Sequence, residues 1–191
     1  MREEILKTAK SLFKEGLFTG ISGNLSAYDA DAGIMTITPT SVPYDEMELN
    51  DIVTMTLGGE QLGGNHKPSS EWRMHAAIYA ACEGIAAIIH THSSYATSFA
   101  VNQMPIPLIL IEMLPMLGGD VQVAPFAQPG TTELGGSALP ALVGRHACLL
   151  ANHGTLAVGK TLTQARQRTS CLEEAAKVYS LALARGEVHT I

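Results

Sequence analysis

Two short apolar segments of this chain are each followed closely by histidine, and this pattern limits the folds that the chain can adopt. His90 and His92 come after residues 86–89, and His153 comes after residues 148–150. Side chains alternate along a strand with a period of two, so His90 and His92 point to the same side. If a neighbouring strand brings His153 beside them, three imidazoles can bind one divalent metal ion and leave further positions open, as in a catalytic site. A single His-x-His pair would instead favour ordinary hydrogen bonding in a polar loop.

An acidic residue, Glu71, strengthens the metal hypothesis. It follows Ser69 and Ser70, and because serine is a favoured N-cap and glutamate suits a first turn, we expect a helix from this point to about Cys82. A carboxylate beside a histidine-bound metal can be a further ligand, or can move a proton to or from the substrate. Alternatively, Glu71 only stabilises the helix N-terminus, by up to about 1 kcal/mol. His75 lies one turn further on, and its position is more typical of a core or surface residue than of a partner of Glu71.

The rest of the chain alternates between helix and strand patterns, with no linker long enough to separate two domains. Apolar periodicity predicts further helices over residues 2–16, 93–101, 131–143 and 161–186. Strands are expected over residues 21–29 and 33–38 as a hairpin, and over 52–57, 86–91, 121–123, 146–151 and 154–158. This order predicts one α/β domain over residues 1–191, with a central sheet and helices on both sides.

Composition excludes several classes of partner. The net charge is −6, and no basic patch is visible, which argues against nucleic acid. The longest apolar stretch, residues 105–117, is too short for a membrane span and contains Glu112. The first residues form a charged amphipathic pattern and not a signal peptide. The 3 cysteines are widely spaced in apolar or helical surroundings, which is typical of a reducing compartment. We therefore expect a cytoplasmic protein.

Three segments predict a site for an anion. They are residues 22–24, residues 38–41 and the Ser69-Ser70 pair, and each combines small residues with hydroxyl or amide donors. A helix N-terminus presents unpaired N–H groups that can join such donors around a phosphate. Any one of these segments alone is also typical of ordinary capping and turns. Three of them, together with a metal site, predict a phosphorylated substrate.

Five motifs in this order resemble the class II aldolase/adducin family, and most of all its branch of L-fuculose-1-phosphate aldolases. They are Gly23–Ser26, Thr36–Thr40, Ser69–Trp72, His90–Ser93 and Asn152–Gly154. The resemblance spans nearly the whole chain. It implies a three-layer α/β/α fold around a mostly antiparallel sheet. It also implies a homotetramer with active sites between adjacent subunits, and a zinc ion, or manganese or another divalent metal.

The resemblance implies a role for each matching residue. His90, His92 and His153 would bind the metal, and Glu71 would transfer the proton and ligate the metal when no substrate is present. The phosphate would be held by Gly23, Asn24, Thr40, Ser41, Ser69 and Ser70. Ser41 departs from the glycine that is often found after the threonine in this family, so it places a side chain where there is normally none.

The implied activity is that of a metal-dependent aldolase, which is a lyase. It would reversibly cleave a ketose 1-phosphate, such as L-fuculose 1-phosphate or a deoxypentulose 1-phosphate, to dihydroxyacetone phosphate and an aldehyde through a metal-stabilised enediolate. Three related reactions stay open as alternatives: those of a pentulose-phosphate 4-epimerase, a methylthioribulose-1-phosphate dehydratase and a sugar-acid phosphate decarboxylase. A non-catalytic adducin-like module is a further alternative, but such modules have lost the histidine ligands that this chain contains.

Glu112 is a second candidate for acid/base catalysis. The aldolases often place a tyrosine from the neighbouring subunit shortly before a Gly-Gly pair. Here that pair is Gly118-Gly119, and the comparable position is Glu112. A carboxylate in an apolar segment is costly to bury without a partner. We therefore expect Glu112 either to reach the site of the adjacent subunit or to form a salt bridge at the rim of a subunit contact.

Overall fold

The computed structural model describes residues 1–191, which form one eight-stranded sheet and the helices around it. The strands are β1 (Asn24–Asp29), β2 (Ile34–Ile37), β3 (Val53–Thr56), β4 (Gln61–Gly63), β5 (Ala87–Thr91), β6 (Val123–Ala124), β7 (Ala147–Leu150) and β8 (Gly154–Gly159). The α-helices are α1 (Arg2–Lys14), α2 (Trp72–Ala81), α3 (Ser94–Val101), α4 (Met113–Leu117), α5 (Thr132–Leu142) and α6 (Leu162–Leu183). A short 3-10 helix, η1, spans Leu49–Asp51.

The strand order across the sheet is β4-β3-β2-β1-β5-β8-β7-β6. All neighbouring strands are antiparallel except β6 and β7, which are parallel. The expected hairpin is present, with Ser26 opposite Ile37 and Asp29 opposite Ile34. The mostly antiparallel sheet that the family resemblance implied is therefore confirmed.

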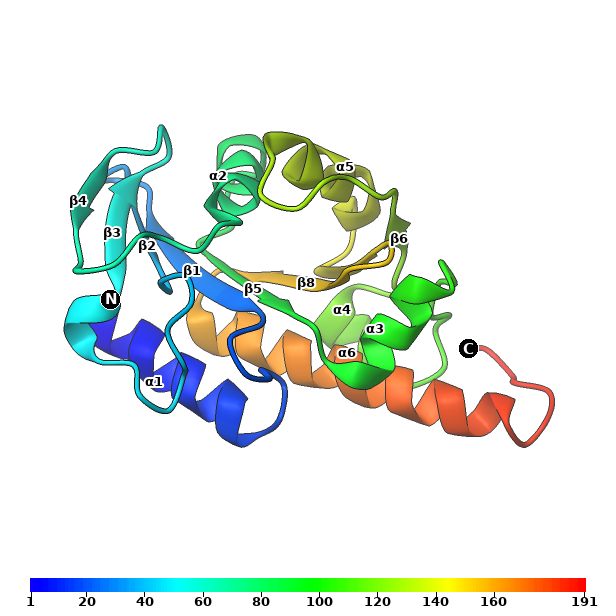
Figure 1. Cartoon of the computed structure of the whole chain (residues 1–191). Coiled ribbons are helices and arrows are strands. Elements are labelled where there is room, and N and C mark those ends of the chain that lie inside the picture. Colours follow the sequence, from blue (N-terminus) through cyan, green and yellow to red (C-terminus); the bar gives the residue numbers. More distant parts are fainter.

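Helices cover both faces of this sheet, as Figure 1 shows: α2 and α5 lie on one face, and α1, α3, α4 and α6 on the other. The alternation along β5 produces this arrangement. Ile88 packs into the core under α2 and α5, whereas Ala87 and Ile89 pack into the core on the side of α1. Complete burial of such a large aliphatic side chain contributes about 1.5–3 kcal/mol to folding. The three-layer α/β/α fold is confirmed.

The structure corrects several expected boundaries. α2 begins at Trp72, so Glu71 occupies the N-cap position and does not lie in the first turn. The strand expected over residues 121–123 is displaced, because Val121 forms an isolated bridge with Ile106 and β6 begins at Val123. The start of α6 is as expected, since the hydroxyl of Thr161 accepts a hydrogen bond from the backbone N–H of Gln164 at 3.1 Å.

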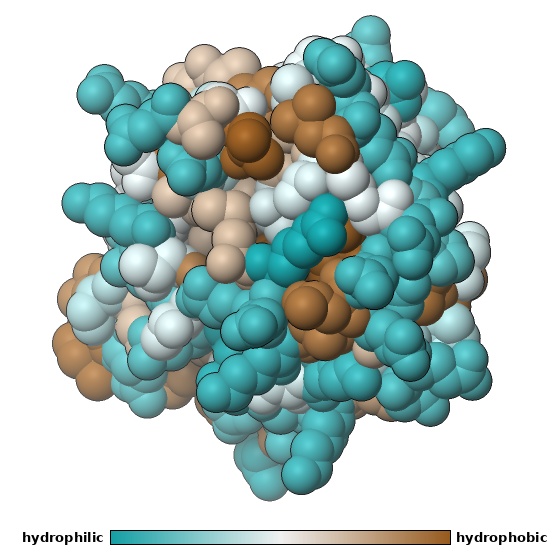
Figure 2. All heavy atoms as spheres, turned by 90° about the vertical axis from the view of Figure 1, so that its left-hand side faces the viewer, coloured by the Kyte–Doolittle hydropathy of each residue, from teal (hydrophilic) through white to brown (hydrophobic).

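Three short elements were not predicted: β4, η1 and α4. β4 forms the edge of the sheet and has only 3 residues, which limits pairing with another chain. The end of the molecule that carries β4 is mostly hydrophilic, with hydrophobic residues in small separate groups (Figure 2). No helix combines the length and the apolar character that crossing a bilayer would require.

The strand register brings three distant segments to one end of the sheet. Asn24, at the start of β1, lies opposite His90 near the end of β5. Thr91 lies opposite Thr155 at the start of β8, directly after the turn that contains His153. The loop that leads into α2 crosses the same end of the sheet (Figure 1). The candidate site is built from these segments.

Candidate metal centre and substrate cavity

Glu71, His90, His92 and His153 form one cluster, in which one ligand atom from each lies within 4.8 Å of those of the others. The Nε2 atom of His90 lies 2.9 Å from Nε2 of His92 and 3.1 Å from Oε2 of Glu71. The Nε2 atom of His153 lies 3.3 Å from Oε1 of Glu71. The structure thus brings together all four residues that the sequence proposed as metal ligands.

The tautomer of His90 follows from its hydrogen bond to the backbone. Its Nδ1 atom lies 2.7 Å from the carbonyl oxygen of Thr155. Because a carbonyl oxygen can only accept, Nδ1 carries a hydrogen, and Nε2, which has the lone pair when the ring is neutral, faces the cluster. A backbone carbonyl that orients a ligand histidine in this way is a common feature of metal sites. Sequence reasoning did not assign this role to Thr155.

Two glycines allow the segments of the site to approach each other. A Cβ atom at Gly154 would clash with the carbonyl oxygen of Thr91 and would lie 2.9 Å from the ring of His92. Gly23 has φ +88°, and a Cβ atom there would lie 2.8 Å from the carbonyl oxygen of His90. Both positions therefore require glycine. The sequence led us to expect that Gly23 lets the backbone approach a phosphate. The structure shows a second reason for glycine here, which is the close contact between this backbone and strand β5.

The electrostatics of the cluster suit a divalent cation. Burial raises the pKa of Glu71, but His90 and His153, when they are protonated, and the hydrogen bond from Asn24 together lower it below its ordinary value. Burial, followed by the charge of His90, lowers the pKa of His92 and of His153 to about 4. Near neutral pH the cluster therefore offers an ionised carboxylate and the lone pairs of His92 and His153, and carboxylate and imidazole are ligands that zinc prefers.

Two buried atoms of the cluster lack a hydrogen-bond partner: Oε1 of Glu71 and Nδ1 of His153. The Oε1 atom of Glu71 is buried and accepts no hydrogen bond, although Nε2 of His153 lies 3.3 Å away. A buried carboxylate oxygen without a partner is costly. A cation among the three imidazoles would compensate its charge, so the residues of this site fit a divalent metal.

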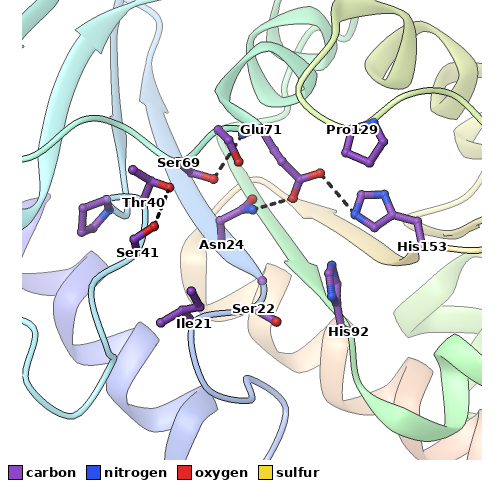
Figure 3. Close-up of a pocket in the computed structure, with 13 residues that line it drawn as sticks. Ile21, Ser22, Asn24, Thr40, Ser41, Ser69, Glu71, His92, Pro129 and His153 are labelled. Carbon is purple, nitrogen blue, oxygen red and sulfur yellow. Dashed lines mark hydrogen bonds and ion pairs between the residues drawn. The ribbon is translucent and has the colours of Figure 1, made fainter.

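A cavity of about 480 Å³ opens beside the cluster. It is lined by Ile21, Ser22, Gly23, Asn24, Pro39, Thr40, Ser41, Ser69, Ser70, Glu71, His92, Pro129 and His153. Figure 3 shows the hydroxyl groups of Thr40, Ser41 and Ser69 on one side of it, the imidazoles of His92 and His153 on the other, and Glu71 between them. All six residues predicted to hold a phosphate lie in the wall of this one cavity.

Backbone contacts hold two of the predicted phosphate segments side by side. The backbone N–H of Ser69 donates to the carbonyl oxygen of Thr38 at 3.0 Å. The backbone N–H of Thr40 donates to the carbonyl oxygen of Lys67 at 3.0 Å. The loop bends sharply at Ser41, which has φ +59°. This left-handed conformation favours glycine, so a serine here is strained. The Ser69 hydroxyl accepts a hydrogen bond from the backbone N–H of Glu71 at 3.3 Å.

Glu112 is the one predicted site residue that lies away from both the cluster and the cavity within this chain. It is exposed, occupies the N-cap position of the five-residue helix α4, and borders a surface groove between α4 and α6 together with Arg166 and Cys171. Burial, followed by the charge of Glu112, raises the pKa of the Cys171 thiol. Because its expected role requires an adjacent subunit, the role of Glu112 stays a prediction.

Comparison with known proteins agrees with this geometry. The family model of the class II aldolase and adducin N-terminal domain matches residues 3–180. A 5-deoxy-D-ribulose 1-phosphate aldolase from Bacillus thuringiensis serovar kurstaki is 34% identical over 186 residues, which is 97% of this chain and 87% of the relative. A 5-methylthioribulose-1-phosphate/5-deoxyribulose-1-phosphate aldolase from Rhodospirillum rubrum is 39% identical over 180 residues, covering 94% of this chain and 80% of the relative.

A solved structure gives the same result for the fold. An L-fuculose 1-phosphate aldolase superimposes with a TM-score of 0.95 at 40% sequence identity, covering 100% of this chain and 89% of that chain. The family resemblance inferred from five sequence motifs is confirmed. The chain belongs to the class II aldolase and adducin family.

Proposed function

We propose that this protein is a divalent-metal-dependent aldolase that reversibly cleaves a ketose 1-phosphate to dihydroxyacetone phosphate and an aldehyde. One observation carries the proposal: three histidines and Glu71 form one cluster, and this cluster adjoins a cavity whose wall also carries uncharged hydroxyl and amide groups. The aldolases for 5-deoxyribulose 1-phosphate and L-fuculose 1-phosphate among the similar proteins support it and suggest the size of the sugar.

His90, His92 and His153 would hold the metal, with Glu71 as a further ligand in the absence of substrate. Three imidazoles and a carboxylate favour zinc, and manganese is the alternative. When bound, the cation would supply a Lewis acid that stabilises negative charge on the substrate. The carbonyl oxygen of Thr155 keeps the Nδ1 hydrogen of His90 away from the cluster, so that Nε2 can serve as a ligand.

The hydroxyl-rich wall would hold the phosphate group. Thr40, Ser41, Ser69 and Ser70 contribute hydroxyl groups, and Asn24 contributes an amide. None of these groups is charged, so binding relies on hydrogen bonds and on backbone N–H groups. The phosphate at this wall would hold the adjacent carbonyl group close to Glu71.

Glu71 would transfer the proton to carbon. Its Oε2 atom accepts a hydrogen bond from the side chain of Asn24 at 2.9 Å, and its Oε1 atom accepts none. One carboxylate oxygen is thus fixed and the other is free to carry a proton to the carbon that becomes the hydroxymethyl group of dihydroxyacetone phosphate. In the condensation direction Glu71 removes the same proton. Glu112 of an adjacent subunit would serve the hydroxyl group that becomes the aldehyde.

The quaternary structure and location belong to the same proposal. We propose that residues 1–191 form a single domain that assembles into a homotetramer, as the family resemblance implies, and that the enzyme acts in the cytoplasm. The continuous sheet from β4 to β6 supports a single domain. Exposed apolar side chains such as Ile111 and Leu114, beside Glu112, support burial of this segment at a subunit contact.

A product assay tests the reaction. Purified protein is incubated with a panel of ketose 1-phosphates and pentulose 5-phosphates, and release of dihydroxyacetone phosphate is followed with a coupled enzyme. We expect release from a deoxypentulose 1-phosphate or from L-fuculose 1-phosphate. Epimerisation, loss of water or loss of carbon dioxide, without dihydroxyacetone phosphate, would replace the aldolase proposal with the corresponding alternative.

A further inference from the structure

A chain of buried polar side chains leads from the core to Glu71. The hydroxyl of Tyr79 lies 2.8 Å from Oγ of Ser26, and that Oγ lies 2.6 Å from Nδ1 of His75. The Nε2 atom of His75 lies 2.6 Å from Oδ1 of Asn24. The amide nitrogen of Asn24 donates to Oε2 of Glu71 at 2.9 Å. The chain thus joins helix α2, strand β1 and the catalytic carboxylate.

The carboxylate fixes the direction of the hydrogen bonds that join Ser26, His75 and Asn24 to it. An ionised Glu71 can only accept, so Asn24 must present its amide N–H to Oε2 and its Oδ1 atom to His75. Oδ1 also only accepts, so Nε2 of His75 carries the hydrogen and Nδ1 accepts from the hydroxyl of Ser26. The Ser26 oxygen can then accept from the hydroxyl of Tyr79. Each of the three bonds from Ser26 to Glu71 therefore donates towards Glu71, whereas the hydrogen of Tyr79 can also reach the carbonyl oxygen of Ser26 at 3.1 Å.

The burial of these hydrogen-bonded polar side chains indicates that they have a role beyond packing. His75 and Ser26 are both 0% exposed, and they lie on the face of the sheet that otherwise packs Met35, Ile88 and Leu156 into an apolar core. Apolar side chains would fill this space without the need for partners, whereas polar ones are costly unless every group is paired. Burial also lowers the pKa of His75 to about 3, so the ring is neutral, as this chain of donors requires.

Resting on the proposed function, we propose that His75 is a positioning residue, which holds the amide of Asn24 in the one orientation that serves both halves of the site. In that orientation one N–H of Asn24 holds Oε2 of Glu71, and the second N–H is available to the phosphate in the cavity that Asn24 lines. Without the donor at Nε2, nothing on the core side prevents the amide from turning over. Its oxygen would then face the Glu71 carboxylate and repel it.

Two substitutions at His75 and one at Ser26 test the proposal. His75→Leu fills the space but has no donor, and His75→Gln restores an N–H near the position of Nε2. Ser26→Ala removes the hydroxyl that donates to Nδ1 of His75 and that also contacts the hydroxyl of Tyr79. Ile78→Val, in the same helix and also buried, is the control for a general loss of packing. For each protein we would measure metal content, kcat, KM, inhibition by inorganic phosphate, and exchange of a hydroxymethyl hydrogen of dihydroxyacetone phosphate with deuterium from the solvent.

We expect kcat and the exchange rate of His75→Leu to fall by about tenfold or more, the scale for loss of a residue that orients a catalytic group. Inhibition by phosphate should weaken in parallel while metal content stays unchanged, and His75→Gln should recover most of both. If His75 has only a structural role, His75→Leu should have a lower melting temperature. Its kcat, exchange rate and inhibition by phosphate, measured per folded enzyme, should then equal those of Ile78→Val. If His75→Leu does not fold, Ser26→Ala decides, with an expected loss of about threefold or more in kcat.

The exchange reaction distinguishes failure of the positioning role of His75 from failure of the proposed function. It needs only the phosphate site, the metal and Glu71, and it involves no aldehyde. If the wild-type protein exchanges no hydrogen and cleaves no ketose 1-phosphate, the proposed function is wrong. If the wild type exchanges hydrogen and both His75→Leu and Ser26→Ala stay within about twofold of it, the positioning role is overturned and the proposed function stands.

Discussion

The Nε2 atoms of His90 and His92 lie 2.9 Å apart. The Nδ1 hydrogen of His90 is committed to the carbonyl oxygen of Thr155, so Nε2 offers a lone pair when the ring is neutral. Nε2 of His92 can donate a hydrogen to that lone pair. A cation between the two rings would take the place of this hydrogen, and both nitrogen atoms could then serve as ligands.

Replacing one of these ligands should remove the metal. We expect about one divalent ion per chain in the wild-type protein, with zinc preferred for three imidazoles. His92→Ala should lose both metal and activity, while its far-ultraviolet circular dichroism remains that of the wild type. Metal content is measured by plasma emission spectroscopy. Full occupancy together with normal turnover in this variant would refute the assignment of His92.

Removing the acid/base character of Glu71 should separate catalysis from metal binding. Glu71→Gln keeps the shape of the side chain and can still accept the hydrogen bond from Asn24, but it cannot carry a proton. We expect the metal to be retained and kcat to fall by about 100-fold or more, the scale for loss of a general acid/base. A loss smaller than about threefold would mean that Glu71 serves only the start of α2.

Ser41 offers a test of backbone strain beside the phosphate wall. Its φ of +59° costs a non-glycine residue about 1–2 kcal/mol. Glycine would remove this strain, but part of the gain is lost because glycine raises the conformational entropy of the unfolded chain. Ser41→Gly should therefore raise the free energy of unfolding by about 0.5–1 kcal/mol in urea. Ser41→Ala keeps the strain and loses the same hydroxyl, so it should not be more stable. If the hydroxyl contacts phosphate, both variants raise KM equally.

Much of this fold and of the metal site follows from local patterns in the sequence. The period of two along residues 86–91 places His90 and His92 on one side of β5, and the structure has this strand at Ala87–Thr91. The apolar segment before His153 likewise indicated a second strand that ends nearby. These patterns are informative because they depend on neighbours in sequence.

Other features depend on contacts between distant residues, and no local pattern reports them. The partners of His75 are 49 and 51 positions away along the chain, so the sequence could indicate only a buried helix residue. The need for glycine at position 154 arises from the approach of its turn to Thr91. The start of α2 was misplaced because Ser69 forms backbone contacts with Thr38 on another segment, which hold residues 69–71 out of the helix.

The neutral state of His75 predicts how stability changes with pH. Its pKa falls from 6.5 to about 3 on folding, so between these values the unfolded chain binds more protons than the folded one. The free energy of unfolding should therefore fall as pH drops below 6.5, by at most about 1.4 kcal/mol per pH unit from this group. His75→Gln, which does not titrate, should show a shallower fall. Urea titrations of both proteins from pH 7 to pH 4 measure the difference, and parallel curves would contradict a neutral His75.

Glu112 should act on the site of an adjacent subunit, and subunit exchange can reveal this. We expect Glu112→Gln to lose activity but keep its metal, because it lies outside the cavity of its own chain. Glu174→Gln changes an acid in the same groove and should remain active. If Glu112→Gln has wild-type activity, Glu112 has no catalytic role, and the remaining expectation is that it forms a salt bridge at the rim of the subunit contact.

Mixing the inactive Glu112→Gln and Glu71→Gln proteins under conditions of subunit exchange then tests where the site lies. If each site takes Glu71 from one chain and Glu112 from its neighbour, some interfaces of a hybrid oligomer receive both intact residues, and activity returns. Exchange is verified with differently tagged proteins that are purified together. A mixture that exchanges subunits but stays inactive would show that both residues serve a site within one chain, or that Glu112 takes no part in it.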